Sequence, residues 1–488
     1  TANFEVFSGN VISPAAQLRG FAVAVLVAAF TILDLTKVNV ALPAIETAFD
    51  IGSTELQLIV SGFVLTFGLT LVPMGRLGDQ RSRRVLFVVG LSLFTLTSLA
   101  CALAPTSEVL LIARLLQGVA AGIQMPQVVG LIQELYQGPE RGRAFGMFGA
   151  TIGLATAFGP TLGGLLIALG GPVDGWRWVF GMNVPLGLLA IILVLTLLPH
   201  TRARSERPLE LDPVGIALFG VSIVVLLWPF LFTTGSPDDD PARWWVLAAL
   251  PVTLTAFVLW ERRYTASGRA PLIELSLMRI TSFRNGTIIA SVYFAAMPTM
   301  FLLTTLYLQG GVELAAVFAG MVTIGFALSS AAASWLSGRL VERFGRALVV
   351  WGLGILLVSV GGLVASAMWL PTGPSIAAMV IVFAIGGIGG GVVIAPNQTL
   401  TLADVPLEQG GVAGSLGQLG QRVGTAIGSA IGLALFSSTV FSESGSKPAI
   451  DVFHDAYGVG MAAVAVLLAV ALLLAIGDLV ARRRSTFV

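Results

Sequence analysis

Fourteen apolar runs, each long enough to cross a bilayer as a helix, dominate this chain of 488 residues. A helix needs about 20 apolar residues to span the hydrocarbon of a membrane. Only 11% of the residues are charged, whereas soluble domains carry about 25%. We therefore expect an all-α integral membrane protein. The runs cover 18–43, 56–76, 84–104, 107–134, 142–170, 177–198, 213–233, 243–262, 285–309, 313–337, 346–369, 374–402, 409–437 and 456–481.

Arginine and lysine residues between the runs predict the orientation. Of the 27 basic residues, 21 fall on the N-terminus and alternate loops, three fall on the opposite loops, and three lie inside runs. Cytoplasmic loops carry such an excess of basic residues, and an even number of spans puts both termini on one side. We predict a multi-pass protein in the lipid bilayer of the plasma (cytoplasmic) membrane, with both termini in the cytoplasm.

The chain contains an internal repeat of six spans. Residues 75–83 follow the second run, and a similar stretch at 338–346 follows the tenth. We expect an N-terminal six-helix half at 18–198, a C-terminal six-helix half at 285–481, and between them a linker at 199–284 that carries two inserted transmembrane helices. Residues 1–17 and 482–488 are predicted to be cytoplasmic. Two such halves with a substrate site between them are a known transporter arrangement.

Three charged side chains lie inside the first and fourth runs. A charge at the centre of a spanning helix costs about 2.5–3.5 kcal/mol and faces a protein interior or a watery path by default. Helical geometry places Asp34 and Lys37 on one face, three positions apart, and puts Arg114 at a similar depth. We expect the three to meet. The alternative is that Lys37, six residues before Pro43, extends to the outer membrane surface.

Polar side chains in other runs are candidates for contact with a substrate. Arg422 shares one helical face with Gln418, and two glutamines of the fourth run share another. The alternative is that the amides only hold helices together and that Arg422 only braces its helix. The predicted substrate-binding residues are Lys37, Gln117, Gln124, Asn397, Gln398, Gln418 and Arg422.

The sign of the charge in a cavity between the halves predicts the substrate. If ionised Asp34 and the cations Lys37, Arg114 and Arg422 all line the cavity, the charges sum to +2. Burying an unpaired like charge costs several kcal/mol. This charge predicts a preference for anionic or zwitterionic amphipathic substrates.

The stretch after the second run resembles the signature of the major facilitator superfamily, Gly-x-Leu-x-Asp-Arg-x-Gly-Arg-Arg, although Gln80 and Ser82 depart from it. Its acid, Asp79, can pair with an arginine or meet a helix N-terminus. We predict that the two copies of this motif form a gate that holds one conformation of the halves. The predicted gating residues are Gly75, Asp79, Arg83 and Arg84 in the first copy and Gly338, Glu342 and Arg346 in the second.

Further motifs resemble the fourteen-helix drug:proton antiporter family of this superfamily. Residues 33–43 are similar to its first-helix motif, but Lys37 stands where the family usually has an apolar residue. Arg114-x-x-Gln117-Gly118 resembles its fourth-helix motif, whose arginine is tied to proton coupling. Residues 159–164 resemble the antiporter motif, which is found in exporters more than in importers; its matching residues are Gly159, Pro160, Gly163 and Gly164.

The resemblance implies a proton-coupled exporter with Asp34 and Arg114 as the proton-coupling residues. Two histidines and one cysteine cannot form the usual zinc or haem ligand sets, and a net charge of +1 gives no support for nucleic-acid binding. We expect no cofactor, no metal site and no enzymatic activity, and a monomer whose partners are protons and a small-molecule substrate. An importer or facilitator of the same fold and a non-transporting sensor or scaffold are the alternatives.

Overall fold

The computed structural model describes residues 13–51, 53–171, 174–198, 212–233, 239–445 and 447–485. Within these ranges the structure is all-helical, and fourteen helical segments are long and apolar enough to cross a membrane, as predicted. Large apolar side chains such as Val358, Trp369 and Trp245 are more than 70% exposed, which suits surfaces that face lipid.

The first half of the chain contains α1 (Pro14–Phe49), α2 (Ser53–Gln80), α3 (Arg83–Ala102), α4 (Ser107–Leu135), α5 (Gly138–Gly170), α6 (Gly175–Gly181) and α7 (Asn183–Leu197). The inserted pair consists of α8 (Pro213–Leu231), the 3₁₀ helix η1 (Pro241–Ala249) and α9 (Leu250–Ala266), followed by the short 3₁₀ helix η2 (Leu275–Arg279).

The second half contains α10 (Thr281–Leu306), the π-helical turn η3 (Tyr307–Gly311), α11 (Ala316–Val322), α12 (Ile324–Phe344), α13 (Arg346–Trp369), α14 (Thr372–Thr401), the 3₁₀ turn η4 (Leu407–Gln409), α15 (Gly410–Glu443) and α16 (Ala449–Ser485). The predicted spans match these elements to within a few residues at most ends.

Two of the spans are broken, which the apolar runs did not predict. The sixth span divides into α6 and α7 at Met182, and the tenth divides into α11 and α12 at Thr323. Pro185 explains the first break. Proline has no N–H to donate within a continuous helix, but in the first turn of α7 the N–H groups have no partner in the helix anyway, so the proline is tolerated there. The break brings Asn183 to the start of α7 and into the protein interior.

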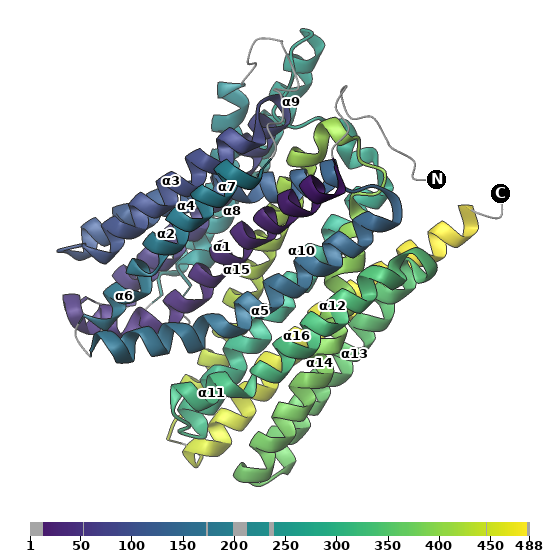
Figure 1. The fold of residues 1–488 in the computed structure, drawn as a ribbon. Helices are drawn as coiled ribbons and strands as arrows, with labels where there is room; N and C mark the ends of the chain where they lie inside the picture. Colours follow the sequence, from purple (N-terminus) through teal and green to yellow (C-terminus); the bar gives the residue numbers. More distant parts are fainter. Residues whose placement is uncertain are drawn as a thin grey trace.

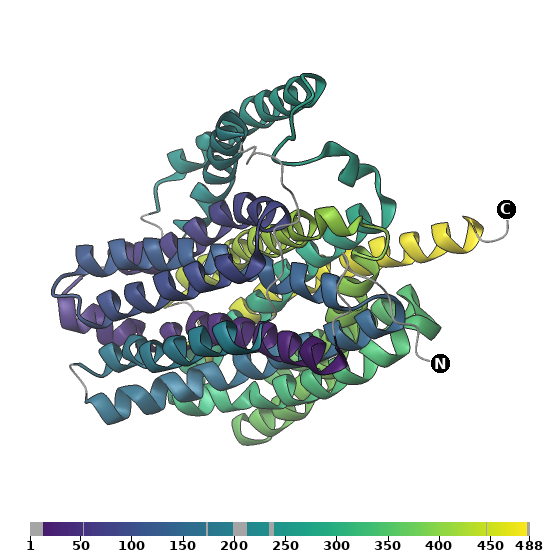
Figure 2. The same cartoon turned by 45° about the horizontal axis from the view of Figure 1, so that its top comes forward.

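The helices form two bundles with separate apolar cores. One core consists of buried side chains between residues 21 and 283. It reaches residues 402–419 of the second half, where the start of α15 packs against α2 and α4. The other core consists of buried side chains between residues 289 and 475. Figure 1 shows the first bundle in purple to teal and the second in green to yellow, with α5 and α15 along the boundary. The inserted helices α8 and α9 lie on the outer side of the first bundle and add side chains such as Phe219 and Phe257 to its core, and α8 packs against α2 and α15 (Figure 2). The residue bounds of the predicted halves stay a prediction.

The bundles meet at the end where α1 begins and α16 ends, which we call the N/C end, and they diverge toward the opposite end (Figure 1). At the N/C end α5 crosses α12 with almost no space between the backbones. A Cβ on Gly338 would lie 2.6 Å from the carbonyl oxygen of Gly142 and 2.8 Å from Cα of Gly146. Glycine is therefore required at position 338 for this closed arrangement.

We predict that Gly338→Ala weakens the closure of the N/C end. The added methyl group meets backbone atoms that cannot rotate away, and such overpacking costs about 1–3 kcal/mol. Spin labels at the exposed positions 143 and 339 should report a longer distance than in the parent protein. Gly354→Ala is the control, because a Cβ there meets nothing within 4 Å. An unchanged distance in Gly338→Ala would show that the close crossing does not hold this end together.

Candidate functional site

A cluster of charged side chains lies inside the first bundle, between α1, α4 and α7. Asp34 and Lys37 are completely buried and Arg114 is 2% exposed. Asp34 Oδ2 lies 3.3 Å from Arg114 Nη1, and Asp34 Oδ1 lies 3.6 Å from Lys37 Nζ. The expectation that these three side chains meet is confirmed. The alternative in which Lys37 extends to the outer surface is wrong, because its ammonium group points inward.

Asn183 completes this cluster, and it was not among the predicted site residues. Its amide nitrogen donates to Asp34 Oδ1 at 2.6 Å and to Ser98 Oγ at 3.1 Å, and its amide oxygen accepts a hydrogen bond from Lys37 Nζ. One amide thus bridges the acid and the base of α1. In the sequence, Asn183 lies in the stretch Trp176-Arg177-Trp178-x-Phe180-x-x-Asn183-x-Pro185, which is also similar to the drug:proton antiporter family but indicates no role for Asn183.

The Arg114 guanidinium group is contacted by two aromatic rings and one amide. Its guanidinium carbon lies 4.2 Å from the centroid of the Phe63 ring and 5.7 Å from that of Phe180. Its Nη1 also donates to Gln117 Oε1 at 2.7 Å, and the Gln117 amide donates to Ser98 at 2.8 Å. Cation–π contacts are strongest when the cation is desolvated, so this surround offsets part of the cost of burying the charge.

The glutamines predicted to contact substrate lie within the first bundle. Gln117 is fully buried in the charge cluster, and Gln124 is fully buried and donates to Thr31 Oγ1 at 2.7 Å. In this conformation both amides serve interhelical hydrogen bonds, the alternative weighed from the sequence. Their role in binding substrate stays a prediction.

The premise that four charges line a cavity between the halves is wrong for this conformation. Asp34, Lys37 and Arg114 are enclosed by the first bundle, where the one carboxylate offsets one of the two cations and leaves a sum of +1. Of the four, only Arg422 lies between the bundles: its guanidinium carbon is 4.9 Å from the ring of Phe67 on α2. Arg422 is therefore the one charge of the four that lies where a substrate between the bundles would meet it.

The antiporter-like motif of α5 packs directly against the charged turn of α1. A Cβ on Gly159 would collide with Thr36, and a Cβ on Gly163 would lie 2.7 Å from the carbonyl oxygen of Lys37. Gly164 faces open space, with nothing within 4 Å. The side chain of Pro160 lies outside the described residues. The close approach of α5 thus fixes the α1 backbone beside the charge cluster.

The first copy of the signature motif latches the two bundles together at the N/C end. The Asp79 carboxylate accepts hydrogen bonds from the backbone N–H groups of Gly411 at 2.8 Å and Val412 at 2.9 Å, in the first turn of α15. Arg83 pairs with Asp79 at 2.7 Å and with Glu134 at 3.3 Å. A carboxylate at a helix N-terminus is stabilised by the helix dipole. Both contacts proposed for Asp79 from the sequence occur together.

The other two predicted gating residues of the first copy, Gly75 and Arg84, differ in their contacts. A Cβ on Gly75 would be 2.7 Å from the carbonyl oxygen of Gly411, so glycine lets α2 approach α15. Arg84 points elsewhere and donates to the carbonyl of Leu195 at the end of α7. The gating role of all these residues stays a prediction.

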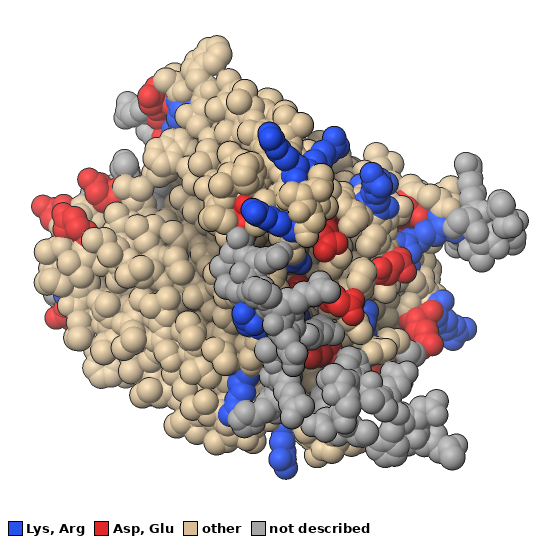
Figure 3. Space-filling model, turned by 90° about the horizontal axis from the view of Figure 1, so that it is seen from above, with Lys and Arg blue, Asp and Glu red and all other residues tan. Residues whose placement is uncertain are grey.

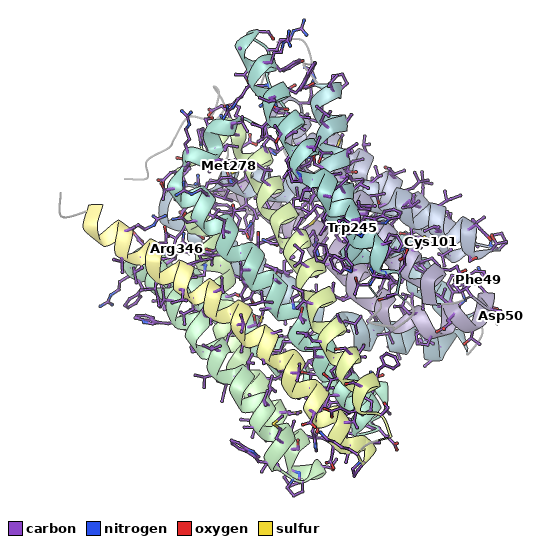
Figure 4. The ribbon with its side chains drawn as sticks, turned by 180° about the vertical axis from the view of Figure 1, so that it is seen from behind. Phe49, Asp50, Cys101, Trp245, Met278 and Arg346 are labelled. Carbon is purple, nitrogen blue, oxygen red and sulfur yellow. The ribbon has the colours of Figure 1, made fainter. Side chains whose placement is uncertain are left out.

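The second copy does not form an equivalent latch. The Glu342 carboxylate is exposed, and no ion pair or hydrogen bond joins it to any described residue. Arg346 instead pairs with Asp478 at 2.6 Å and donates to Asn397 at 2.5 Å, all within the second bundle. Asn397 therefore serves a structural network in this conformation (Figure 4 labels Arg346). The expectation that the repeat supplies Glu342 as a second latch is wrong for this conformation.

Three predicted substrate residues remain, two on α15 and one on α14. Gln418 is 6% exposed, and neither its amide nitrogen nor its amide oxygen has a hydrogen-bond partner among the described residues. Arg422, one turn further along α15, has an unpartnered buried Nε in the same part of the chain. Gln398 is half-buried and lines a small pocket between α10, α14 and α15.

We predict that Gly163→Ala disturbs the site whereas Gly164→Ala does not. The methyl group at position 163 meets the backbone of Lys37 and pushes α1 away from α5, at a cost of about 1–3 kcal/mol. Thermal unfolding of the purified proteins in one detergent should show a lower midpoint for Gly163→Ala alone. Equal midpoints for the two variants would refute the close packing.

Known proteins resemble this chain over most of its length. Residues 24–315 match the family model of the Major Facilitator Superfamily. A "probable actinorhodin transporter" of Streptomyces coelicolor is 34% identical over 422 residues, which cover 85% of this chain and 71% of that protein. A tetracenomycin C resistance and export protein of Streptomyces glaucescens is 30% identical over 453 residues, covering 89% and 79%.

A solved structure shares the fold. The human organic anion transporter MFSD10 superposes with a TM-score of 0.65 over 95% of this chain and 100% of that chain, at 16% identity. The fourteen spans also agree with the resemblance to the fourteen-helix drug:proton antiporters. On the family match and the identity to these relatives, the chain belongs to the Major Facilitator Superfamily of secondary transporters.

Proposed function

We propose that this protein exports amphipathic small molecules from the cytoplasm in exchange for protons, by alternating access. The observation that carries the proposal is a fully buried carboxylate held between two cations in a transporter of this superfamily. The name of one relative, the tetracenomycin C resistance and export protein, favours export over the import alternative. The excess of basic residues in the loops of this side supports a cytoplasmic N/C end.

Asp34 is the proposed proton carrier. With Asp34 ionised, the charge cluster has a sum of +1; protonation would raise it to +2 and leave Lys37 and Arg114 without a counter-charge. An uncompensated buried charge costs several kcal/mol. Proton binding therefore requires the cluster to open toward water or toward an anionic group, which couples the proton to a change of conformation.

Gln418 and Arg422 are the proposed first contacts for the substrate. Leaving a buried donor or acceptor unpaired costs about 1–3 kcal/mol. Three such atoms lie here: the amide nitrogen and oxygen of Gln418 and, one helical turn further along, the Nε of Arg422. A ligand with hydrogen-bonding oxygens would satisfy them, and the Phe67 ring below Arg422 offers an apolar contact. This pair supports an acidic or zwitterionic amphipathic substrate class, because Arg422 alone of the four charges considered from the sequence would meet the substrate.

We predict that Asp34→Asn abolishes proton exchange. The amide keeps the shape of the side chain but cannot release a proton at physiological pH. Proteoliposomes that contain a pH-sensitive dye, given actinorhodin or tetracenomycin C as probes, should show substrate-evoked proton movement with the parent protein and none with Asp34→Asn, at equal amounts of folded protein.

The control for Asp34 is Asp174→Asn, which removes an exposed acid paired with Arg177. Its proton signal should match that of the parent. A normal signal in Asp34→Asn would rule out this role. Probe movement without any proton signal in the parent would instead favour a facilitator.

Asp79→Asn should change turnover more than apparent substrate affinity. The substitution removes the charge that holds the first turn of α15, and a charged hydrogen bond of this kind contributes about 1.5–3 kcal/mol. Glu342→Gln is the matched control, because that acid is exposed in the second copy. Initial rates of probe uptake over a range of concentrations measure both constants. A tenfold loss of affinity with normal turnover would show that Asp79 does not act as a latch.

A further inference from the structure

A basic cavity lies at the N/C end, outside the central region between the bundles. Its volume is about 1180 Å³, and its walls come from the end of α2, the end of α9 and the η2 segment. Figure 3, the view from above, shows Lys and Arg side chains on this part of the molecule with Asp and Glu side chains among them. Four arginines line the cavity, namely Arg76, Arg262, Arg269 and Arg279.

The charge of the cavity is strongly positive. One acid, Glu274, lies in the wall, and it already accepts a hydrogen bond from the Gln409 amide at 2.5 Å. Among the described residues, no ion pair joins Arg262, Arg269 or Arg279 to an acid. The buried Nε of Arg76 also lacks a hydrogen-bond partner in this part of the chain. Among the side chains that line the cavity, four guanidinium groups and one acid leave an excess of three positive charges, and the buried Glu261 behind the wall offsets part of the charge of Arg76.

The cavity lies at the depth of the lipid headgroups. Arg76 is near the end of the span Leu58–Gln80, and Arg262 is near the end of the span Pro241–Ala266. Spans end where the hydrocarbon gives way to the polar headgroup layer. The rim is partly apolar: Met278, which Figure 4 labels, belongs to it, and Val258 and Leu275 are half-buried. Met278 is 39% exposed.

We infer that this cavity binds the phosphate-bearing headgroup of an anionic phospholipid. Guanidinium groups match phosphate oxygens with paired hydrogen bonds, and basic pockets at the cytoplasmic side of spanning helices suit anionic headgroups. The apolar rim favours a lipid over a free phosphate ion, because the first acyl carbons need an apolar contact. A zwitterionic lipid would leave the excess positive charge without compensation.

A headgroup in this cavity would connect the inserted helices to the latch. Arg76 is three residues before Asp79, and Glu274 is bonded to Gln409, which directly precedes α15. The bound lipid would thus join α2, α9 and the η2 segment beside the contact that closes the N/C end. This inference does not depend on the proposed proton-coupled export.

The test compares lipid binding to variants of equal charge. One variant carries Arg262→Gln, Arg269→Gln and Arg279→Gln; the control carries Arg143→Gln, Arg263→Gln and Arg343→Gln, three exposed arginines outside the cavity. Native mass spectrometry of the detergent-purified full chain measures the binding of dioleoyl phosphatidylglycerol, with dioleoyl phosphatidylcholine and inorganic phosphate as further probes.

Phosphatidylglycerol should bind the parent and the control alike, and its affinity should fall on the order of 100-fold in the cavity variant, at about 1 kcal/mol per arginine. Phosphatidylcholine should bind the parent weakly. Equal binding of phosphatidylglycerol to the cavity variant and the control would overturn the site. Displacement of phosphatidylglycerol by millimolar phosphate would show that the cavity is a free-anion site and would overturn the lipid assignment. Melting temperatures of both variants check that they are folded.

Discussion

The balance of three charges inside the first bundle is the constraint on which the rest of the structure depends. A carboxylate or an ammonium group in an apolar bundle is tolerated only when it is paired and hydrogen-bonded. Here one acid meets two cations, and the Asn183 amide joins the acid to Lys37. The break between α6 and α7 and the glycines of α5 both serve this arrangement, since each brings a backbone to the turn that carries the charges.

Closure of the N/C end is a second, separate device. Backbones of α5 and α12 touch at Gly142 and Gly338, while the Asp79 carboxylate holds the first turn of α15. Both contacts join one bundle to the other, whereas the charge cluster lies within one bundle. In the proposed mechanism a change of protonation would act on this closure through the helices, and α1, α4 and α5 each run from the cluster to the N/C end.

The sequence predicted those features that depend on period and composition. Fourteen spans follow from apolar length, and the meeting of Asp34, Lys37 and Arg114 follows from helical angle and depth. Helical angle shows that two side chains share a face of a helix, but it does not show whether that face turns toward a cavity or toward the bundle interior. Gln117 and Gln124 were therefore predicted to contact substrate, although they lie inside the bundle.

Other features of the site depend on which elements touch. Asn183 became a site residue through a helix break that no apolar run reveals. Repeat symmetry predicted a second latch at Glu342. The repeated motif does not make the same side-chain contacts in the second half, where Arg346 pairs with Asp478 on α16. The interiors of the two bundles differ in the same way. The first bundle holds a charge cluster, whereas the second holds aromatic rings, with the ring centroids of Phe301 and Phe383 stacked 5.7 Å apart.

The charge balance is tested most directly by a double-mutant cycle on unfolding of the purified protein, with Asp34→Asn, Lys37→Met and both together. The single variants change the sum of the cluster from +1 to +2 and to 0, and breaking a buried pair costs about 3–5 kcal/mol. The double variant restores +1. We predict that it is more stable than the less stable single variant, with a coupling energy well above the ~0.5 kcal/mol expected of independent sites. Additive losses would contradict the account.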